Sequence, residues 1–236
     1  MKKLTGAILL LAAIAGAAVY AGRADAYDEP EGSQSQTMEQ FLTSVTKDVD
    51  AYWTKTFEDS GLSEPRVSYG WIPAGQAAQS ACGPLDDSAA AYCSGDDTIY
   101  ISEQFASDIY SGALDHALPG SSQGFGRTYG DFAVAYIVAH EYGHQIQDEL
   151  GLFQQYGQQL PTMAFELQAD CYAGAWAHSA AQENRVDDED VQEALDAALA
   201  VGDFDTANPG HHGTPEQRRE AWLSGFESGD PAACNL

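Results

Sequence analysis

Two histidines and a glutamate in one short segment are the residues best suited to chemistry. His140, Glu141 and His144 form an H-E-x-x-H pattern that follows an apolar stretch, residues 132–139. Residues four apart lie on one face of a helix, so the two imidazoles can converge on one zinc ion, with Glu141 beside them toward a metal-bound water. The pattern predicts a zinc site that activates water. The alternative is that the two histidines only cap or pack a helix. That interpretation does not explain why Glu141 stands between them.

A zinc site of this kind needs a third protein ligand, and its fourth position is left for water. Leu150 stands where the H-E-x-x-H-x-x-G-x-x-H pattern requires a histidine, so that pattern is excluded. Glu166 remains, and Asp170 follows four residues later on the same face of a predicted helix. We expect Glu166 to bind the metal and Asp170 to hold the distal nitrogen of a ligating histidine. The alternative for Glu166 is a solvated surface acid, although two acids among apolar neighbours are costly without a cation.

Two segments resemble a known family. Residues 140–151 read HEYGHQIQDELG and residues 166–177 read ELQADCYAGAWA, and both are similar to a bacterial family of neutral zinc metallopeptidases. The resemblance extends over most of the chain after the N-terminal segment. It includes the cysteine loop at 82–93, the turn at 202–203 and the segment 212–218.

The resemblance implies one zinc ion per chain, bound by His140, His144 and Glu166 as in gluzincins, with Glu141 as the catalytic acid and base. It also implies a zincin-like domain with a small sheet and an active-site helix that carries H-E-x-x-H. The chain departs from the family pattern at Gln145, where a further histidine is usual. That position is not needed for coordination, so the departure concerns local substrate contacts.

Peptide hydrolysis also needs a group that stabilises the oxyanion. His212 is our candidate, because it lies in a predicted loop before a helix and matches its family counterpart. A packing or helix-start histidine is the alternative role. His211 and Tyr172 are competing candidates, and we expect Arg218 to pair with a carboxylate.

Composition limits the possible functions. The 236 residues include 36 acidic and 10 basic side chains, which gives a formal net charge of −26. Hydrophobic residues make up 44% and aromatic residues 11% of the chain, enough to bury a core, so a disordered acidic chain is excluded. A surface this negative repels phosphates, and we expect no nucleic-acid partner.

The N-terminus has the features of a secretory signal peptide. Lys2 and Lys3 precede an apolar run over residues 4–21, and Ala24-Asp25-Ala26 offers a small-residue cleavage site. The alternative is an uncleaved membrane anchor, because the run approaches the roughly 20 residues that span a bilayer. We expect a secreted protein with a signal peptide (1–26), a flexible leader (27–36) and one metallopeptidase domain (37–236). In the anchored form, only this segment would contact the membrane.

Four cysteines follow the signal peptide, and an even number in an exported protein indicates disulfides. Of three possible pairings we favour Cys82 with Cys93, because the residues between them suit a compact loop, and this leaves Cys171 with Cys234. Free buried thiols are one alternative. A Cys2His2 zinc site is the other, and no C-x2-C spacing supports it.

Hydrophobic periodicity predicts a mainly helical α+β fold. We expect strands at 66–72 and 98–101, and helices at 38–57, 102–117, 129–150, 162–182, 187–201 and from Thr214 onward. The function indicated is a secreted zinc metallopeptidase that acts on a peptide or protein substrate. A non-catalytic zinc protein of the envelope and a zinc hydrolase of non-peptide amides are the alternatives.

Overall fold

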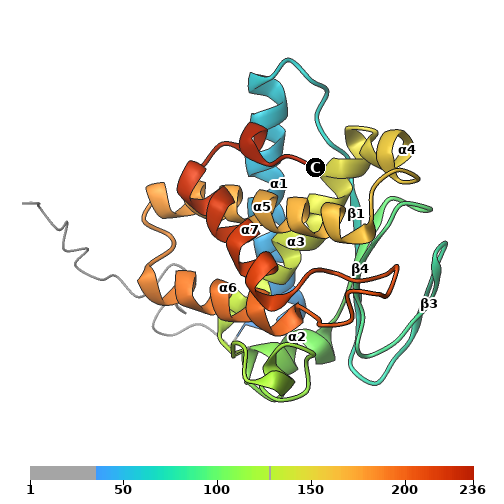
Figure 1. Ribbon diagram of the computed structural model, residues 1–236, viewed down its shortest axis with the longest axis vertical. Coiled ribbons are helices and arrows are strands. Elements are labelled where there is room, and N and C mark those ends of the chain that lie inside the picture. Colours follow the sequence, from blue (N-terminus) through green and yellow to red (C-terminus); the bar gives the residue numbers. More distant parts are fainter. Residues whose placement is uncertain (1–35, 128) are drawn as a thin grey trace, which may run out of the picture.

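The computed structural model describes residues 36–127 and 129–236, so the predicted signal peptide and most of the leader lie outside the described residues (Figure 1). The described chain is α+β and mainly helical, as predicted. The helices are α1 (Met38–Asp59), α2 (Glu103–Tyr110), α3 (Asp131–Glu149), α4 (Leu152–Tyr156), α5 (Thr162–Gln182), α6 (Asp188–Val201) and α7 (Pro215–Ser228). None of these helices is long and apolar enough to cross a membrane.

The strands form two small sheets: β1 (Ser68–Ile72), β5 (Thr98–Ser102) and β4 (Ala90–Cys93) in that order, and a separate pair of β2 (Ala78–Ser80) and β3 (Gly83–Leu85). Strand β5 pairs in parallel with β1 and antiparallel with β4. Strand β4 is therefore an edge strand, and it packs against α3.

Helix α3 lies at the centre of the domain. Its residues 132–143 are all buried, and it contacts α1, α2, α5, α6 and the sheet. Figure 1 shows α5, α6 and α7 on one side of α3 and the sheet on the other. A helix that is apolar on all sides is stable only when it is enclosed in this way, and the enclosure fixes the helix that carries H-E-x-x-H.

A glycine allows α3 and α5 to approach closely. A Cβ at Gly143 would lie 3.0 Å from both Cα and O of Ala169, closer than most real Cβ contacts, so the two helices would have to move apart. Helices α5 and α7 meet in the same way, because a Cβ at Gly225 would collide with the carbonyl of Cys171. The close contacts bring His140 and His144 on α3 toward Glu166 on α5.

The two disulfides have the pairing that the sequence favours. Cys82 and Cys93 connect the β2–β3 turn to the end of β4, and Cys171 and Cys234 connect α5 to the C-terminal tail. The second bridge closes a separation of 63 residues, which restricts the unfolded chain more than a short loop does.

Sequence periodicity was wrong about some short elements. The helix expected at 102–117 ends at Tyr110, because Gly112 adopts a φ of +75° and the chain turns there. Strands β2, β3 and β4 and helix α4 have three to five residues each, too few to show a period. The strands expected at 66–72 and 98–101 are present as β1 and β5.

Carboxylates surround the N-terminus of α3. Glu193 accepts a hydrogen bond from the Phe132 N–H at 2.9 Å, and carboxylate oxygens of Asp131, Asp190 and Glu193 lie within 4.8 Å of one another. Burial and then the neighbouring Asp131 raise the pKa of Glu193 to about 7. The folded state therefore binds a proton on Glu193 more tightly than the unfolded state does, and this protonation stabilises the fold. Its contribution to stability is complete below pH 4.5 and is lost as the pH rises through about 7.

We therefore expect Glu193→Gln to stabilise the protein at pH 8 by up to about 1 kcal/mol, because one pKa unit corresponds to about 1.4 kcal/mol and partial exposure screens the charge. The side-chain oxygen of the introduced glutamine can still accept the hydrogen bond from the Phe132 N–H. Chemical denaturation at pH 4 and pH 8 measures the effect, which should vanish at pH 4. Glu189→Gln, on the exposed start of α6, is the matched control. A Glu193 variant less stable than wild type at pH 8 would contradict this explanation.

Candidate metal centre

Three side chains from two helices converge at one point. His140 Nε2 lies 3.2 Å from Glu166 Oε2, and His144 Nε2 lies 3.4 Å from Glu166 Oε1. One potential ligand atom from each residue lies within 4.8 Å of the other two. The structure therefore brings together the three residues that the sequence singled out.

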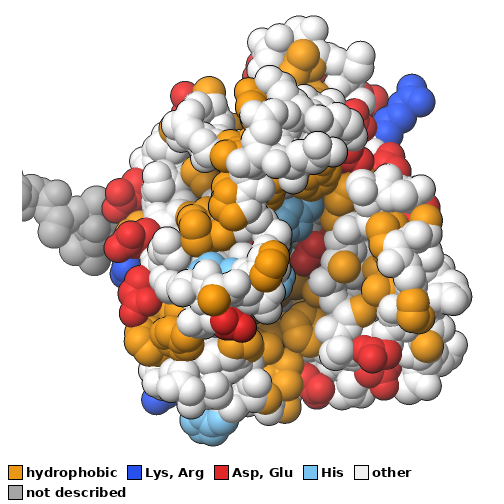
Figure 2. Space-filling model, turned by 45° about the vertical axis from the view of Figure 1, so that its right-hand side comes forward, with side chains coloured by type: hydrophobic (Ala, Val, Ile, Leu, Met, Phe, Trp, Pro, Cys, Tyr) orange, Lys and Arg blue, Asp and Glu red, His pale blue; other side chains and the backbone are white. Residues whose placement is uncertain are grey.

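The site opens into a hollow between the helices and the sheet. Figure 2 shows histidine and acidic side chains at the base of this hollow, with hydrophobic side chains around it. The adjoining cavity has a volume of about 390 Å³, and its lining includes Tyr92, His144, Phe153, Phe165 and Glu166. A ligand at the three side chains can therefore be reached from solvent.

Asp170 contacts His140, the first of the two histidines. Its Oδ1 lies 2.9 Å from His140 Nδ1 and accepts a hydrogen bond from the Tyr136 hydroxyl at 2.7 Å. Its Oδ2 accepts from Arg218 Nε. With a proton on Nδ1 directed at Asp170, the lone pair of Nε2 faces Glu166 and is available to a metal.

The electrostatics of this cluster are set by opposing effects. Burial would raise the pKa of Asp170, which is 0% exposed, but Arg218 and His140 outweigh burial and lower it. Burial and Arg218 would lower the pKa of His140, but the carboxylates of Asp170 and Glu166 raise it to about 9. The carboxylates thus favour a cation at this point, whether a proton or a metal ion.

The second histidine has a different partner, which sequence reasoning missed. His144 Nδ1 lies 2.9 Å from Gln147 Oε1, and Gln147 Nε2 donates to the Phe165 carbonyl at 2.7 Å. Gln147 also donates to Gln168, whose own amide donates to the carbonyl of Cys234. The spacing of three residues between His144 and Gln147 was the available signal. The Cys171–Cys234 bridge supports this chain of hydrogen bonds from the tail.

Glu141 lies beside the three converging groups and not among them. Its side chain is directed to the sheet, where Oε2 accepts a hydrogen bond from the Tyr92 backbone N–H at 2.8 Å. The residue is 8% exposed. A buried carboxylate next to a metal site but outside its donor set is suited to proton transfer.

Arg218 is at the centre of the site, although the sequence predicts for it only some carboxylate partner. It is buried in α7, donates to both oxygens of Asp170, and lies 3.5 Å from Glu166 Oε2. Its Nη2 also donates to the Tyr136 hydroxyl at 3.1 Å. The guanidinium therefore connects α7 to the carboxylates of α5.

The two candidate histidines before α7 share one carboxylate. His211 is buried, with Nδ1 2.5 Å from Asp203 Oδ1, while its Nε2 has no hydrogen-bond partner among the described residues. His212 donates its backbone N–H to Asp203 Oδ2, and its side chain is 55% exposed. Asp203 thus holds the loop, and the His212 imidazole is accessible. Tyr172, the other competitor, is buried in the hydrophobic core.

The donor set fits zinc. Two imidazole nitrogens and one carboxylate oxygen, supplied by His140, His144 and Glu166, are the three protein ligands of a zinc site with an open fourth position. Both imidazoles have their distal nitrogens engaged by Asp170 and Gln147, the support that such ligands require. The acidic group at the start of α3 offers only oxygen donors and does not match this chemistry.

Comparison with known proteins supports this assignment. A family model described as "Putative neutral zinc metallopeptidase" matches residues 9–236. The chain belongs to this zinc metallopeptidase family.

Curated relatives are similar over most of this chain. One is "Uncharacterized protein YpfJ" of Escherichia coli K12, 34% identical over 230 residues, which cover 87% of this chain and 72% of the relative. Another is "Uncharacterized protein Rv2575" of Mycobacterium tuberculosis H37Rv, 34% identical over 212 residues, which cover 79% of this chain and 66% of the relative. No solved structure matches the chain significantly.

We expect Asp170→Asn to weaken zinc binding by about 10- to 100-fold, because the amide neither fixes nor strengthens His140 as a carboxylate does. Competition with a chromophoric chelator measures the affinity, after circular dichroism has verified the fold. Asp50→Asn is the matched control, because Asp50 also accepts a hydrogen bond from a tyrosine of α3, Tyr142, at 2.6 Å. Equal affinities in the two variants would show that Asp170 does not support the ligand.

Proposed function

We propose that this protein is a secreted, zinc-dependent peptidase that hydrolyses peptide bonds in a peptide or protein substrate. The position of Glu141 carries the proposal. A purely structural zinc site has no use for a carboxylate beside the metal, and usually closes its fourth position with a Cys or His. Here three donors converge, and the carboxylate of Glu141 lies beside them without belonging to the group.

One zinc ion per chain, held by His140, His144 and Glu166, would supply a polarised scissile carbonyl and a water of lowered pKa. Glu141 is the general base and acid of the protein. It accepts the proton of the attacking water and delivers it to the leaving amine. Because one of its oxygens is occupied by the Tyr92 N–H, the other serves in proton transfer.

The hollow beside His144 supports an extended substrate with an apolar side chain next to the scissile bond. Phe153, Leu160 and Phe165 line it together with Tyr92. Apolar walls with a few polar groups at one end are typical of ligand sites. No Lys or Arg is among the described residues that line it, in keeping with a neutral or cationic substrate segment.

Secretion is supported by two features of the chain. The two disulfides persist in an oxidising compartment and are rare in the cytosol. The N-terminal 26 residues have the pattern of a signal peptide. We infer that the domain acts outside the cytoplasm after this segment is cleaved.

We expect Glu141→Gln to retain one zinc per chain and to lose hydrolysis by at least about 100- to 10,000-fold, because glutamine cannot accept the proton. Zinc analysis and cleavage of an unstructured peptide library, on wild type and variant, test this. Glu149→Gln, at the end of the same helix, is the control that should retain turnover. Zinc in both proteins with no cleavage by wild type would contradict the peptidase assignment and favour a binding protein or a hydrolase of other amides. Cleavage that survives in the variant would show that Glu141 is not the base.

His212 is our proposed oxyanion-stabilising residue, because its imidazole is accessible and its backbone is fixed by Asp203. We expect His212→Ala to lower kcat by about 100-fold with little effect on stability, a magnitude typical of an oxyanion donor. His211→Ala should chiefly lower the melting temperature, because it removes a buried partner of Asp203. Retained turnover in His212→Ala, with loss in a stable His211→Ala, would transfer the role to His211.

A further inference from the structure

Tyr92 contacts the active-site helix at two points seven residues apart. Its backbone N–H donates to Glu141 Oε2 at 2.8 Å, and its hydroxyl lies 2.9 Å from Asp148 Oδ2. The same hydroxyl lies 3.0 Å from Asp97 Oδ1, in the turn that joins β4 to β5. One residue of the sheet thus holds both the proposed base and the last turns of α3.

The register of β4 explains why this N–H is available. Ala91 is paired with Tyr100 and Cys93 with Thr98, and the Ala89 carbonyl accepts a hydrogen bond from Ser102. In an antiparallel pair, successive residues direct their N–H groups alternately toward and away from the partner strand. Tyr92 therefore directs its N–H to the free edge of the sheet, where Glu141 accepts it.

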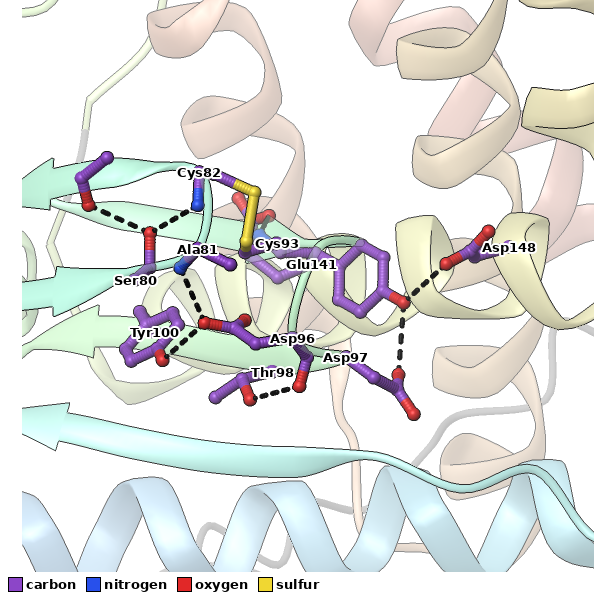
Figure 3. Close-up of a disulfide and its surroundings, with 12 residues drawn as sticks. Ser80, Ala81, Cys82, Cys93, Asp96, Asp97, Thr98, Tyr100, Glu141 and Asp148 are labelled. Carbon is purple, nitrogen blue, oxygen red and sulfur yellow. Dashed lines mark hydrogen bonds between the residues drawn. A yellow bond between two sulfur atoms is a disulfide. The ribbon is translucent and has the colours of Figure 1, made fainter.

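The surroundings of Tyr92 fix its position. The adjacent Cys93 is bonded to Cys82, and Figure 3 shows this disulfide close to Glu141, with Asp97 and Asp148 farther from it. Asp97 has a φ of +51°, a backbone conformation that persists where neighbouring contacts determine it. Burial and the two carboxylates raise the pKa of Tyr92, so its hydroxyl remains a hydrogen-bond donor.

We propose that Tyr92 is a positioning residue for Glu141: its hydroxyl anchors β4 to α3, so that its backbone N–H holds the base beside the metal site. The proposal rests on the proposed function for its effect on turnover. It assigns to Tyr92 no contact with the reacting atoms. Because a displacement of about 1 Å in a catalytic group can cost 100-fold in rate, an anchor of this kind affects kcat without contributing to zinc binding.

The experiment compares Tyr92→Phe with Tyr100→Phe. The second is a matched control, because the Tyr100 hydroxyl also donates to an aspartate of the turn between β4 and β5, Asp96 Oδ2, at 3.1 Å. In Tyr92→Phe we expect kcat to fall about tenfold, because loss of one hydroxyl should displace Glu141 by less than the roughly 1 Å that costs 100-fold. KM should change less than about twofold because the ring that lines the cavity remains. Zinc content should stay the same, and Tyr100→Phe should match wild type.

A second measurement does not depend on turnover. In the metal-free protein, the amide proton of residue 92 is followed by NMR and hydrogen exchange. We expect its chemical shift to move in Glu141→Gln, and its exchange to be at least about tenfold faster in Tyr92→Phe than in wild type, because exchange reports local opening. Tyr100→Phe should leave the exchange of this amide unchanged.

These measurements separate the two proposals. If wild type cleaves no peptide but the residue-92 amide responds as expected, the peptidase assignment fails and the contact between Tyr92 and Glu141 stands. An unchanged kcat and unchanged exchange in Tyr92→Phe would overturn the positioning role. Equal losses of kcat in both tyrosine variants, or a loss of zinc in Tyr92→Phe, would also overturn it, because either result indicates a general structural effect.

Discussion

The candidate metal centre depends on one buried charge, the carboxylate of Asp170. It is fully enclosed, and it receives hydrogen bonds from Arg218 on α7 and from Tyr136 on α3, while His140 lies against the same carboxylate. A buried carboxylate is tolerated only when it is paired and hydrogen-bonded, and removal of one partner costs several kcal/mol. Three helices are therefore held together at the point where the three candidate zinc ligands converge, and Gly143 permits the close approach that this requires.

The opposite wall of the site is made by the sheet. Edge strand β4 is tied to α3 through Tyr92 and to the β2–β3 turn through the Cys82–Cys93 bridge. The other disulfide holds the C-terminal tail against α5, where the carbonyl of Cys234 ends the hydrogen-bonded chain that begins at His144. Each bridge thus supports one side of the centre. The two histidines, the proposed base Glu141 and their supports are buried or half-buried, so the geometry is fixed by packing and not by flexible loops.

The sequence predicted the parts of the site that depend on local periodicity. His140, His144, Glu166 and Asp170 could be found because a spacing of four residues places side chains on one helical face. The positions of Arg218 and Tyr92 could not be predicted this way. They reach the site from α7 and β4, so their contacts depend on how distant segments pack.

The same distinction holds for the fold. The long helices and strands β1 and β5 follow from apolar and β-branched patterns. Strand β4, which contributes the Tyr92 N–H, has four residues of which three are alanine or cysteine, and such a segment carries little β signal. Its conformation is imposed by pairing with β5 and packing on α3, which are tertiary effects.

We propose that His140, His144 and Glu166 form one zinc site. Zinc-edge X-ray absorption on the purified chain, combined with metal analysis, tests this most directly. We predict one zinc per chain with two imidazole nitrogens and oxygen ligands in its first shell, at about 2.0–2.2 Å, and no sulfur. A zinc-free protein under zinc-replete conditions, or sulfur at about 2.3 Å, would contradict the assignment.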